Sequence, residues 1–280
     1  MSEEILTETG IEKFKNHLIE SEKSLLTVQK YIRELNCLKE FMKGQTICKT
    51  KLLEYREFLQ KKGQSRTVNT KLSAINAYLE FAGLAKNKIK FLKVQHRVFA
   101  NDEQELSEAE YRRLLAAAYN KRNKRLYHII MTICATGIRV SELFFITVEA
   151  LRAGKVEIRL KGKVRTVILQ KELADKLKRY VKERGIRSGI VFCTSSGKAL
   201  DRSNIHHDMK KICKAARVDS AKVFPHNLRH LFARSYYAVE KNLAHLADIL
   251  GHSSVETTRI YVAVGQRAHR RTLEKMRLIL

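Results

Sequence analysis

The 280-residue chain holds 55 lysines and arginines against 29 aspartates and glutamates, a net charge of +26, and 44% of its residues are hydrophobic. That hydrophobic share is typical of a globular protein with a buried core, and no apolar stretch approaches the roughly 18 residues of a membrane span. So large a positive charge favours a polyanionic partner, above all nucleic acid. The opening MSEEILTETG has neither the basic nor the apolar segment of a signal peptide, which predicts a soluble, cytoplasmic protein with no membrane partner.

The cysteine and proline content narrows the class of protein further. The cysteines are odd in number and no two have C-x-x-C spacing, so we expect no disulfide framework, no metal site and no cofactor. We interpret all five as buried, reduced thiols: Cys37, Cys48, Cys134, Cys193 and Cys213. A single proline, Pro225, and abundant leucine, lysine, alanine and glutamate predict a mainly helical chain.

Residues 1–95 are predicted to form a bundle of four helices, because apolar residues recur there at helical spacing. The four apolar stripes begin at Ile11, Val28, Leu52 and Val68. Residues 86–105 show no helical period, and we interpret this stretch as the connection between two domains, with 96–105 as the linker proper. Ser107 and Glu110 then match a capping box, which marks the start of a second domain over residues 106–280.

The second domain mixes helices with a short sheet. An apolar helix from Leu126 to Ala135 runs into Gly137. Apolar and charged residues then alternate over 156–161, and a second apolar run follows Lys161-Gly162-Lys163, which predicts a β-hairpin with a short basic tip. The pattern is helical again from residue 170. The predicted fold is therefore mainly α, a helical N-terminal bundle followed by an α+β domain with a small antiparallel sheet.

Positive charge gathers in two separate regions of the chain. Residues 51–100 hold eleven basic and three acidic residues, and residues 151–200 hold fourteen and four. One region lies in each predicted domain, which favours a protein that grips duplex DNA from two sides.

Five short stretches resemble the signature of the tyrosine recombinase, or phage integrase, family. They are ATGIRVSEL (135–143), RLKGKVR (159–165), PHNLRH (225–230), LGHSS (250–254) and Tyr261. Their order and the nine-residue spacing from His252 to Tyr261 match that family. The resemblance implies a SAM-like core-binding domain before a catalytic domain, site-specific recombination through a 3′-phosphotyrosine, and a tetramer on paired DNA sites. It implies no metal and no ATP, and it is compatible with an accessory protein.

The same residues suit the chemistry of strand cleavage. Arg139 and Arg229 are forked donors for phosphate oxygens, and His252 can donate a further hydrogen bond to a phosphate. His226 lies three residues before Arg229, which places both on one helical face. Tyr261 is then the nucleophile. The general acid for the leaving 5′-oxygen is Lys161.

Other interpretations stay open at this stage. Each site residue alone has an ordinary structural explanation; Arg139, for example, suits a surface ion pair with Glu142. The hairpin loop is about one residue shorter than the family's usual Gly-Lys-Gly-x-Lys-x-Arg run, so alignment from the Arg165 side favours Lys163 over Lys161.

The layout resembles compact Xer-like enzymes but also occurs in mobile elements. The rival functions are a non-catalytic DNA-binding protein of this fold and a type IB topoisomerase-like relaxase. The apolar residues of the tail, 264–280, suit packing in their own subunit or in a neighbour.

Overall fold

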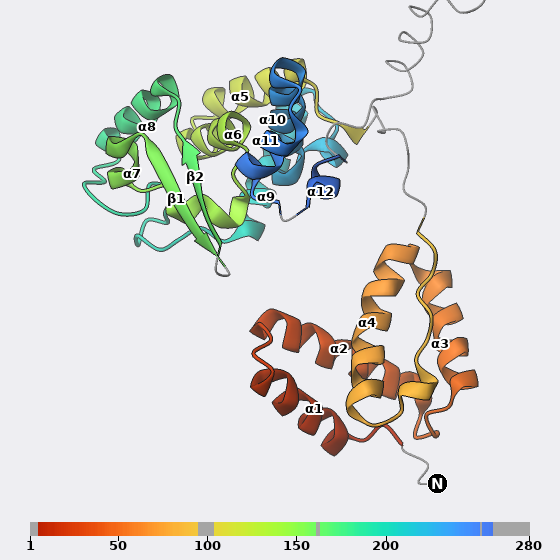
Figure 1. Cartoon of the computed structure of the whole chain (residues 1–280). Coiled ribbons are helices and arrows are strands. Elements are labelled where there is room, and N and C mark those ends of the chain that lie inside the picture. Colours follow the sequence, from red (N-terminus) through yellow and green to blue (C-terminus); the bar gives the residue numbers. More distant parts are fainter. Residues whose placement is uncertain (1–4, 95–103, 161–162, 253, 260–280) are drawn as a thin grey trace, which may run out of the picture. The chain divides into compact units, whose positions relative to one another are not determined.

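The computed structural model describes residues 5–94, 104–160, 163–252 and 254–259. The chain divides into two compact units, Met1–His96 and Arg97–Leu280 (Figure 1), and each has its own buried core. The predicted class, mainly helical with a small antiparallel sheet, is confirmed. Across the described residues, no helix combines the length and apolarity that crossing a bilayer requires.

The first unit is the predicted bundle of helices. Its elements are α1 (Glu8–Glu20), α2 (Leu25–Met42), α3 (Lys49–Lys62), α4 (Ser65–Phe81) and the short 3-10 turn η1 (Ala85–Asn87). Leu35, Leu52 and Leu72, one from each of α2, α3 and α4, are completely buried. The apolar stripes therefore face one another, as their spacing predicts.

The interpretation of residues 86–105 as one continuous connection is wrong at its N-terminal end. Ile89 is buried in the core of the first unit. The side-chain amide of Asn76 pairs with both backbone groups of Ile89 (2.9 Å each), and Asn69 does the same for Leu92 (2.8 and 2.9 Å). The segment lacks a helical period because two asparagines of α4 hold it extended, a tertiary interaction that periodicity does not reveal.

The second unit begins with the predicted capping box, in which Ser107 and Glu110 satisfy each other's backbone N–H groups. Its elements are α5 (Glu108–Asn120), α6 (Lys124–Thr136), η3 (Val140–Phe145), α7 (Val148–Ala153), β1 (Lys155–Leu160), β2 (Lys163–Ile168), α8 (Lys171–Glu183), α9 (Arg202–Ala216), η4 (Ser220–Lys222), α10 (Pro225–Glu240), α11 (Leu243–Leu250) and α12 (Val255–Arg259). Strands β1 and β2 pair antiparallel as the predicted hairpin, with Lys155 opposite Ile168. Helix α7 packs against β1 of this hairpin and against α8 (Figure 1).

The C-terminal ends of α6 and α11 and the N-terminal end of α10 lie close together in the second unit. Helix α10 packs against α6 and α11, and α11 also packs against β2. Helix α6 ends at Gly137 and α11 ends at Gly251, both at φ +64°. Pro225 stands in the first turn of α10, where its fixed φ and missing N–H fit a helix start. The predicted site residues Arg139, His226 and His252 follow directly after these helix termini.

The expectation that all five cysteines are buried is wrong. Cys213 is buried, Cys134 and Cys193 are half-buried, and Cys37 and Cys48 are exposed. Cys37 belongs to α2 and Cys48 precedes α3. The preference of cysteine for the interior is a tendency of composition, whereas the position on a helix face decides the exposure of each one.

Candidate active site

Three arginines converge on the C-terminal end of α11. The last two carbonyl groups of this helix, at residues 249 and 250, and the carbonyl of the capping Gly251 accept in chain order from Arg165, Arg229 (2.7 Å) and Arg139 (3.3 Å). The final carbonyls of a helix lack intrahelical partners and carry partial negative charge, so guanidinium groups satisfy and neutralise them. Three segments that are distant in sequence are thereby fixed around one turn.

The carboxylate of Glu142 binds two of these arginines, Arg139 and Arg165. It is 1% exposed and accepts from the backbone N–H of Arg139 (2.8 Å), from Nη1 of Arg139 (2.9 Å) and from Nη2 of Arg165. The i,i+3 ion pair between Arg139 and Glu142 is therefore present, but it is not an ordinary surface pair, because the carboxylate is buried and is shared with Arg165. Arg139 keeps 39% of its side chain exposed, so its guanidinium is oriented but still reaches solvent.

Arg229 is the most deeply buried cation of the site, with 1% exposure. Its Nη1 donates to the carbonyl of Gly137 (2.6 Å), and its Nη2 reaches Nε2 of His252 (3.0 Å) as well as the α11 terminus. At Gly137 a side chain would need the left-handed conformation, and its Cβ would lie 2.4 Å from the Phe232 ring. Glycine is therefore required where α6 turns into the Arg139 segment.

The two predicted histidines differ in their surroundings. His252 is half-buried, with Nδ1 2.7 Å from Oγ1 of Thr258, and Thr258 is completely buried. Burial and the guanidiniums of Arg229 and Arg139 lower the pKa of His252 to about 4. His226 is exposed in the first turn of α10. Lost hydration and the same two guanidiniums also lower the pKa of His226. Both rings are therefore neutral near pH 7.

The charges of the site leave it ready for an anion. The site holds three guanidiniums and one buried carboxylate, Glu142, which pairs with two of them. Neither His226 nor His252 adds or removes charge at neutral pH. A surplus of fixed positive charge fits a phosphodiester, whose oxygens match the guanidinium fork. Among the described residues, no three His, Cys, Asp or Glu side chains gather as metal ligands would.

Two predicted site residues lie outside the described part of the chain. They are Lys161, between β1 and β2, and Tyr261, two residues after the last residue of α12. The described residues bring Arg139, Arg229 and His252 into one hydrogen-bonded cluster. Arg165 and Thr258 also belong to this cluster and were not among the predicted site residues. Position within the RLKGKVR motif was the available signal for Arg165, and no sequence pattern marks Thr258.

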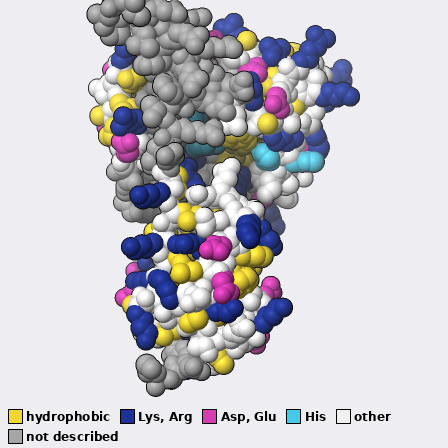
Figure 2. All heavy atoms as spheres, turned by 90° about the vertical axis from the view of Figure 1, so that its right-hand side faces the viewer, with side chains coloured by type: hydrophobic (Ala, Val, Ile, Leu, Met, Phe, Trp, Pro, Cys, Tyr) yellow, Lys and Arg dark blue, Asp and Glu magenta, His cyan; other side chains and the backbone are white. Residues whose placement is uncertain are grey.

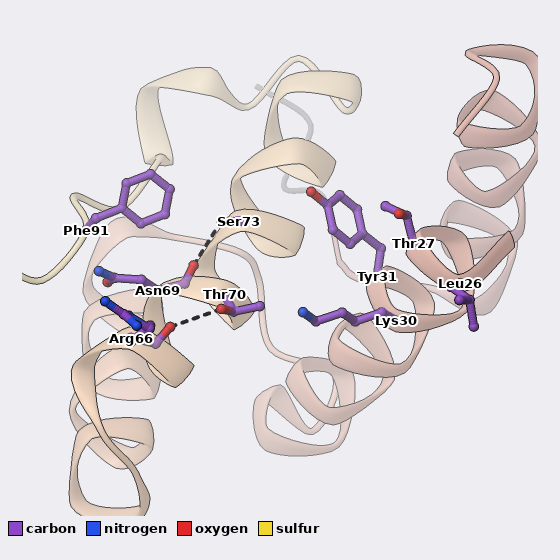
Figure 3. A pocket seen from close by; sticks show the side chains of 9 residues that line it. All are labelled: Leu26, Thr27, Lys30, Tyr31, Arg66, Asn69, Thr70, Ser73 and Phe91. Atoms are coloured by element: carbon purple, nitrogen blue, oxygen red, sulfur yellow. Dashed lines mark hydrogen bonds between the residues drawn. The ribbon is translucent and has the colours of Figure 1, made fainter. Parts of the chain in front are cut away.

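A second basic feature belongs to the first unit. A groove of about 630 Å³ runs between α2 and α4 and is lined by Leu26, Thr27, Lys30, Tyr31, Arg66, Asn69, Thr70, Ser73 and Phe91 (Figure 3). Lys30 and Arg66 are exposed on opposite walls. Lysine and arginine side chains are also spread over the visible face of this unit (Figure 2). Cations, hydroxyls and amides are the groups that commonly contact DNA phosphates.

Comparison with known proteins covers both units. Residues 104–267 match the model of the phage integrase family, and residues 11–86 match that of the phage integrase N-terminal SAM-like domain. The chain is 28% identical to tyrosine recombinase XerA of Pyrococcus horikoshii, over 99% of this chain and 96% of that protein. It is 30% identical to tyrosine recombinase XerD of Vibrio cholerae, over 85% and 86%. A lambda integrase tetramer bound to a Holliday junction shares the fold, with a TM-score of 0.75 at 14% identity, over 93% and 78% of the two chains.

Proposed function

Because the chain belongs to the phage integrase family and is a site-specific tyrosine recombinase that acts on DNA, we propose that Tyr261 is its nucleophile. The tyrosine oxygen forms a bond to the scissile phosphorus, the bond from phosphorus to the 5′-oxygen breaks, and a 3′-phosphotyrosine results. The observation that carries the proposal is the cluster of Arg139, Arg229 and His252 around the end of α11, with its surplus of positive charge.

The roles of the other residues follow from their chemistry. Arg139 and Arg229 stabilise the extra negative charge that develops on the phosphorane oxygens. His252 donates a hydrogen bond to one of those oxygens, and His226, in the first turn of α10, is a further candidate for phosphate contact. Lys161 supplies the proton that the leaving 5′-oxygen takes up.

Rejoining reverses the same exchange. A 5′-hydroxyl of the partner strand attacks the phosphotyrosine, the phosphodiester re-forms, and the tyrosine oxygen regains a proton. Each step trades one phosphate ester for another, so the reaction needs no ATP. Arg139 and Arg229 supply the positive charge that a metal provides in other phosphoryl transfers, so the reaction needs no metal. The energy of the original bond is conserved in the covalent intermediate.

The partner is double-stranded DNA, held by both units. We assign core-site binding to residues 1–95, where the groove between α2 and α4 offers phosphate donors, and cleavage to residues 106–280, joined by the linker 96–105. We further propose that four subunits assemble on two DNA sites and act as alternating pairs, which the tetrameric state of the lambda integrase relative supports. We assign the activity to the cytoplasm. The tail 264–280, for which packing in its own or a neighbouring subunit stayed open, lies outside the described residues.

The test is covalent capture on DNA. A duplex nicked near the scissile phosphate loses a short fragment after cleavage, so the protein–DNA adduct accumulates and survives denaturant. We expect the adduct with the native protein, also in EDTA, and no adduct with Tyr261→Phe at nearly unchanged DNA affinity, because backbone contacts carry the affinity. Tyr119→Phe is the matched control, since Tyr119 is exposed on α5. Adduct formation by Tyr261→Phe contradicts the proposal, and relaxation of supercoils without paired sites identifies a topoisomerase instead.

A further inference from the structure

Thr258 holds the ring of His252 from the side opposite Arg229. Its side chain is completely buried on α12, and Oγ1 lies 2.7 Å from Nδ1 of the imidazole. On α6, by contrast, Thr132 and Thr136 each donate to the carbonyl four residues earlier, the usual bond of a helical threonine. The Thr258 hydroxyl instead faces a side chain of the active site.

The neighbours of His252 determine which of its nitrogens carries the proton. A guanidinium only donates, so Nε2 of the neutral ring accepts from Nη2 of Arg229 (3.0 Å). The single ring proton then resides on Nδ1 and is donated to Oγ1 of Thr258. In this state Nε2 has no proton to offer to a phosphate.

A neutral His252 that donates to the scissile phosphate requires the opposite tautomer. A phosphate oxygen bound here replaces Nε2 of His252 as the acceptor of the Arg229 N–H. For His252 to donate to the same phosphate, Nε2 must carry the ring proton. The ring gives the Nδ1 proton to water and takes one from water at Nε2, so its net charge is unchanged and Nδ1 becomes an acceptor. A hydroxyl can accept in the first state and, after rotation, donate in the second, whereas a carboxylate in the same place only accepts.

We infer that Thr258 is a positioning residue whose hydroxyl orients His252 both without and with bound DNA. When a DNA phosphate takes the place of the His252 ring as the partner of Arg229, this hydroxyl permits the ring to change tautomer. The inference rests on the proposed function of His252 as a phosphate donor. Thr258 lies three residues before Tyr261 in the sequence, so this hydrogen bond also connects His252 to the segment that carries the proposed nucleophile.

Two variants separate the hydroxyl from the shape of the side chain. Thr258→Val keeps the branched shape without a hydrogen bond, and Thr258→Ser keeps the hydroxyl. We expect Thr258→Val to slow single-turnover cleavage of the nicked duplex by roughly 10–100-fold, the loss that follows when the hydrogen-bond partner of a metal-binding histidine is removed. DNA affinity and melting temperature should change little. Thr258→Ser should cleave at nearly the native rate, and so should Thr257→Val, an exposed neighbour on α12.

A double-mutant cycle separates this inference from the proposed function. In a His252→Ala background, Thr258→Val should slow cleavage no further, because the group that it positions is gone. An equal loss in both backgrounds, or native-like cleavage by Thr258→Val while His252→Ala is slow, overturns the inference alone. Native-like cleavage by His252→Ala overturns the proposed role of His252 itself.

The tautomer of His252 can also be observed directly, in a protein that keeps Thr258. Nitrogen-15 NMR of labelled histidine in Tyr261→Phe, which binds but does not cleave, should show the His252 proton on Nδ1 without DNA and on Nε2 with DNA. The same tautomer in both states overturns the exchange.

Discussion

The buried carboxylate of Glu142 gives the sharpest prediction for stability. Glu142→Gln keeps the size of the side chain but removes the charge that accepts from Arg139 twice and from Arg165 once. Hydrogen bonds to charged groups contribute about 1.5–3 kcal/mol each, and breaking a buried ion pair costs about 3–5 kcal/mol. Arg139 is 39% exposed and water will partly replace its lost partner, so we expect a loss of about 3 kcal/mol.

Thermal unfolding measures this loss. For a domain of this size about 1 kcal/mol corresponds to roughly 2–4 °C, so the transition of the catalytic unit should fall by about 6–12 °C. Covalent capture of DNA should weaken as well, because the backbone and side chain of Arg139 lose their shared anchor. Glu157→Gln is the matched control: Glu157 pairs with Arg159 on the exposed hairpin, and its loss should leave the transition almost unmoved. A Glu142→Gln protein that melts with the native one refutes the reasoning.

Two further predictions concern DNA affinity and the turn after α11. Binding should weaken steeply with salt, by roughly 10³–10⁵-fold between 50 and 200 mM if 6–10 phosphates are contacted; a flat dependence in a filter-binding titration means that the two basic regions serve another purpose. Gly251→Ala should destabilise the protein more than Gly154→Ala, because both glycines have positive φ but only at Gly251 would a Cβ meet a side chain, 2.5 Å from Cδ of Arg165. Equal melting temperatures of the two variants would show that the Arg165 contact contributes nothing.

Local patterns in the sequence predicted the elements well. The capping box at Ser107, the hairpin over 155–168 and the helix start at Pro225 each depend on residues within a few positions of one another, and such signals need no knowledge of the rest of the chain. The error over residues 86–94 arose because Asn69 and Asn76 hold that segment from another element, and nothing in the segment itself indicates it.

The same distinction applies to the site. The motifs predicted Arg139, Arg229 and His252 as members of one site, and the structure brings these three together. They did not predict that three consecutive carbonyls, at residues 249–251, bind the arginines of the site. Every residue has a backbone carbonyl, so no residue type in the sequence marks such a role. The motifs also left open whether Glu142 lies on the surface or in the core, since an i,i+3 spacing is the same for a buried pair and for an exposed one.

The identity of the general acid gives the last prediction, because the sequence admits two lysines. If Lys161 donates the proton, Lys161→Ala should slow cleavage of a normal phosphodiester by about 10²–10⁴-fold. The same variant should cleave a substrate with sulfur in place of the bridging 5′-oxygen almost as fast as the native protein, because a thiolate leaves without a proton. Lys163→Ala should lose activity modestly and equally on both substrates, as expected of a phosphate contact. Rescue by sulfur of Lys163→Ala and not of Lys161→Ala would show that the general acid is Lys163, the lysine favoured by alignment from the Arg165 side. Rescue of neither variant would mean that the proton comes from another group and that the hairpin serves DNA binding alone.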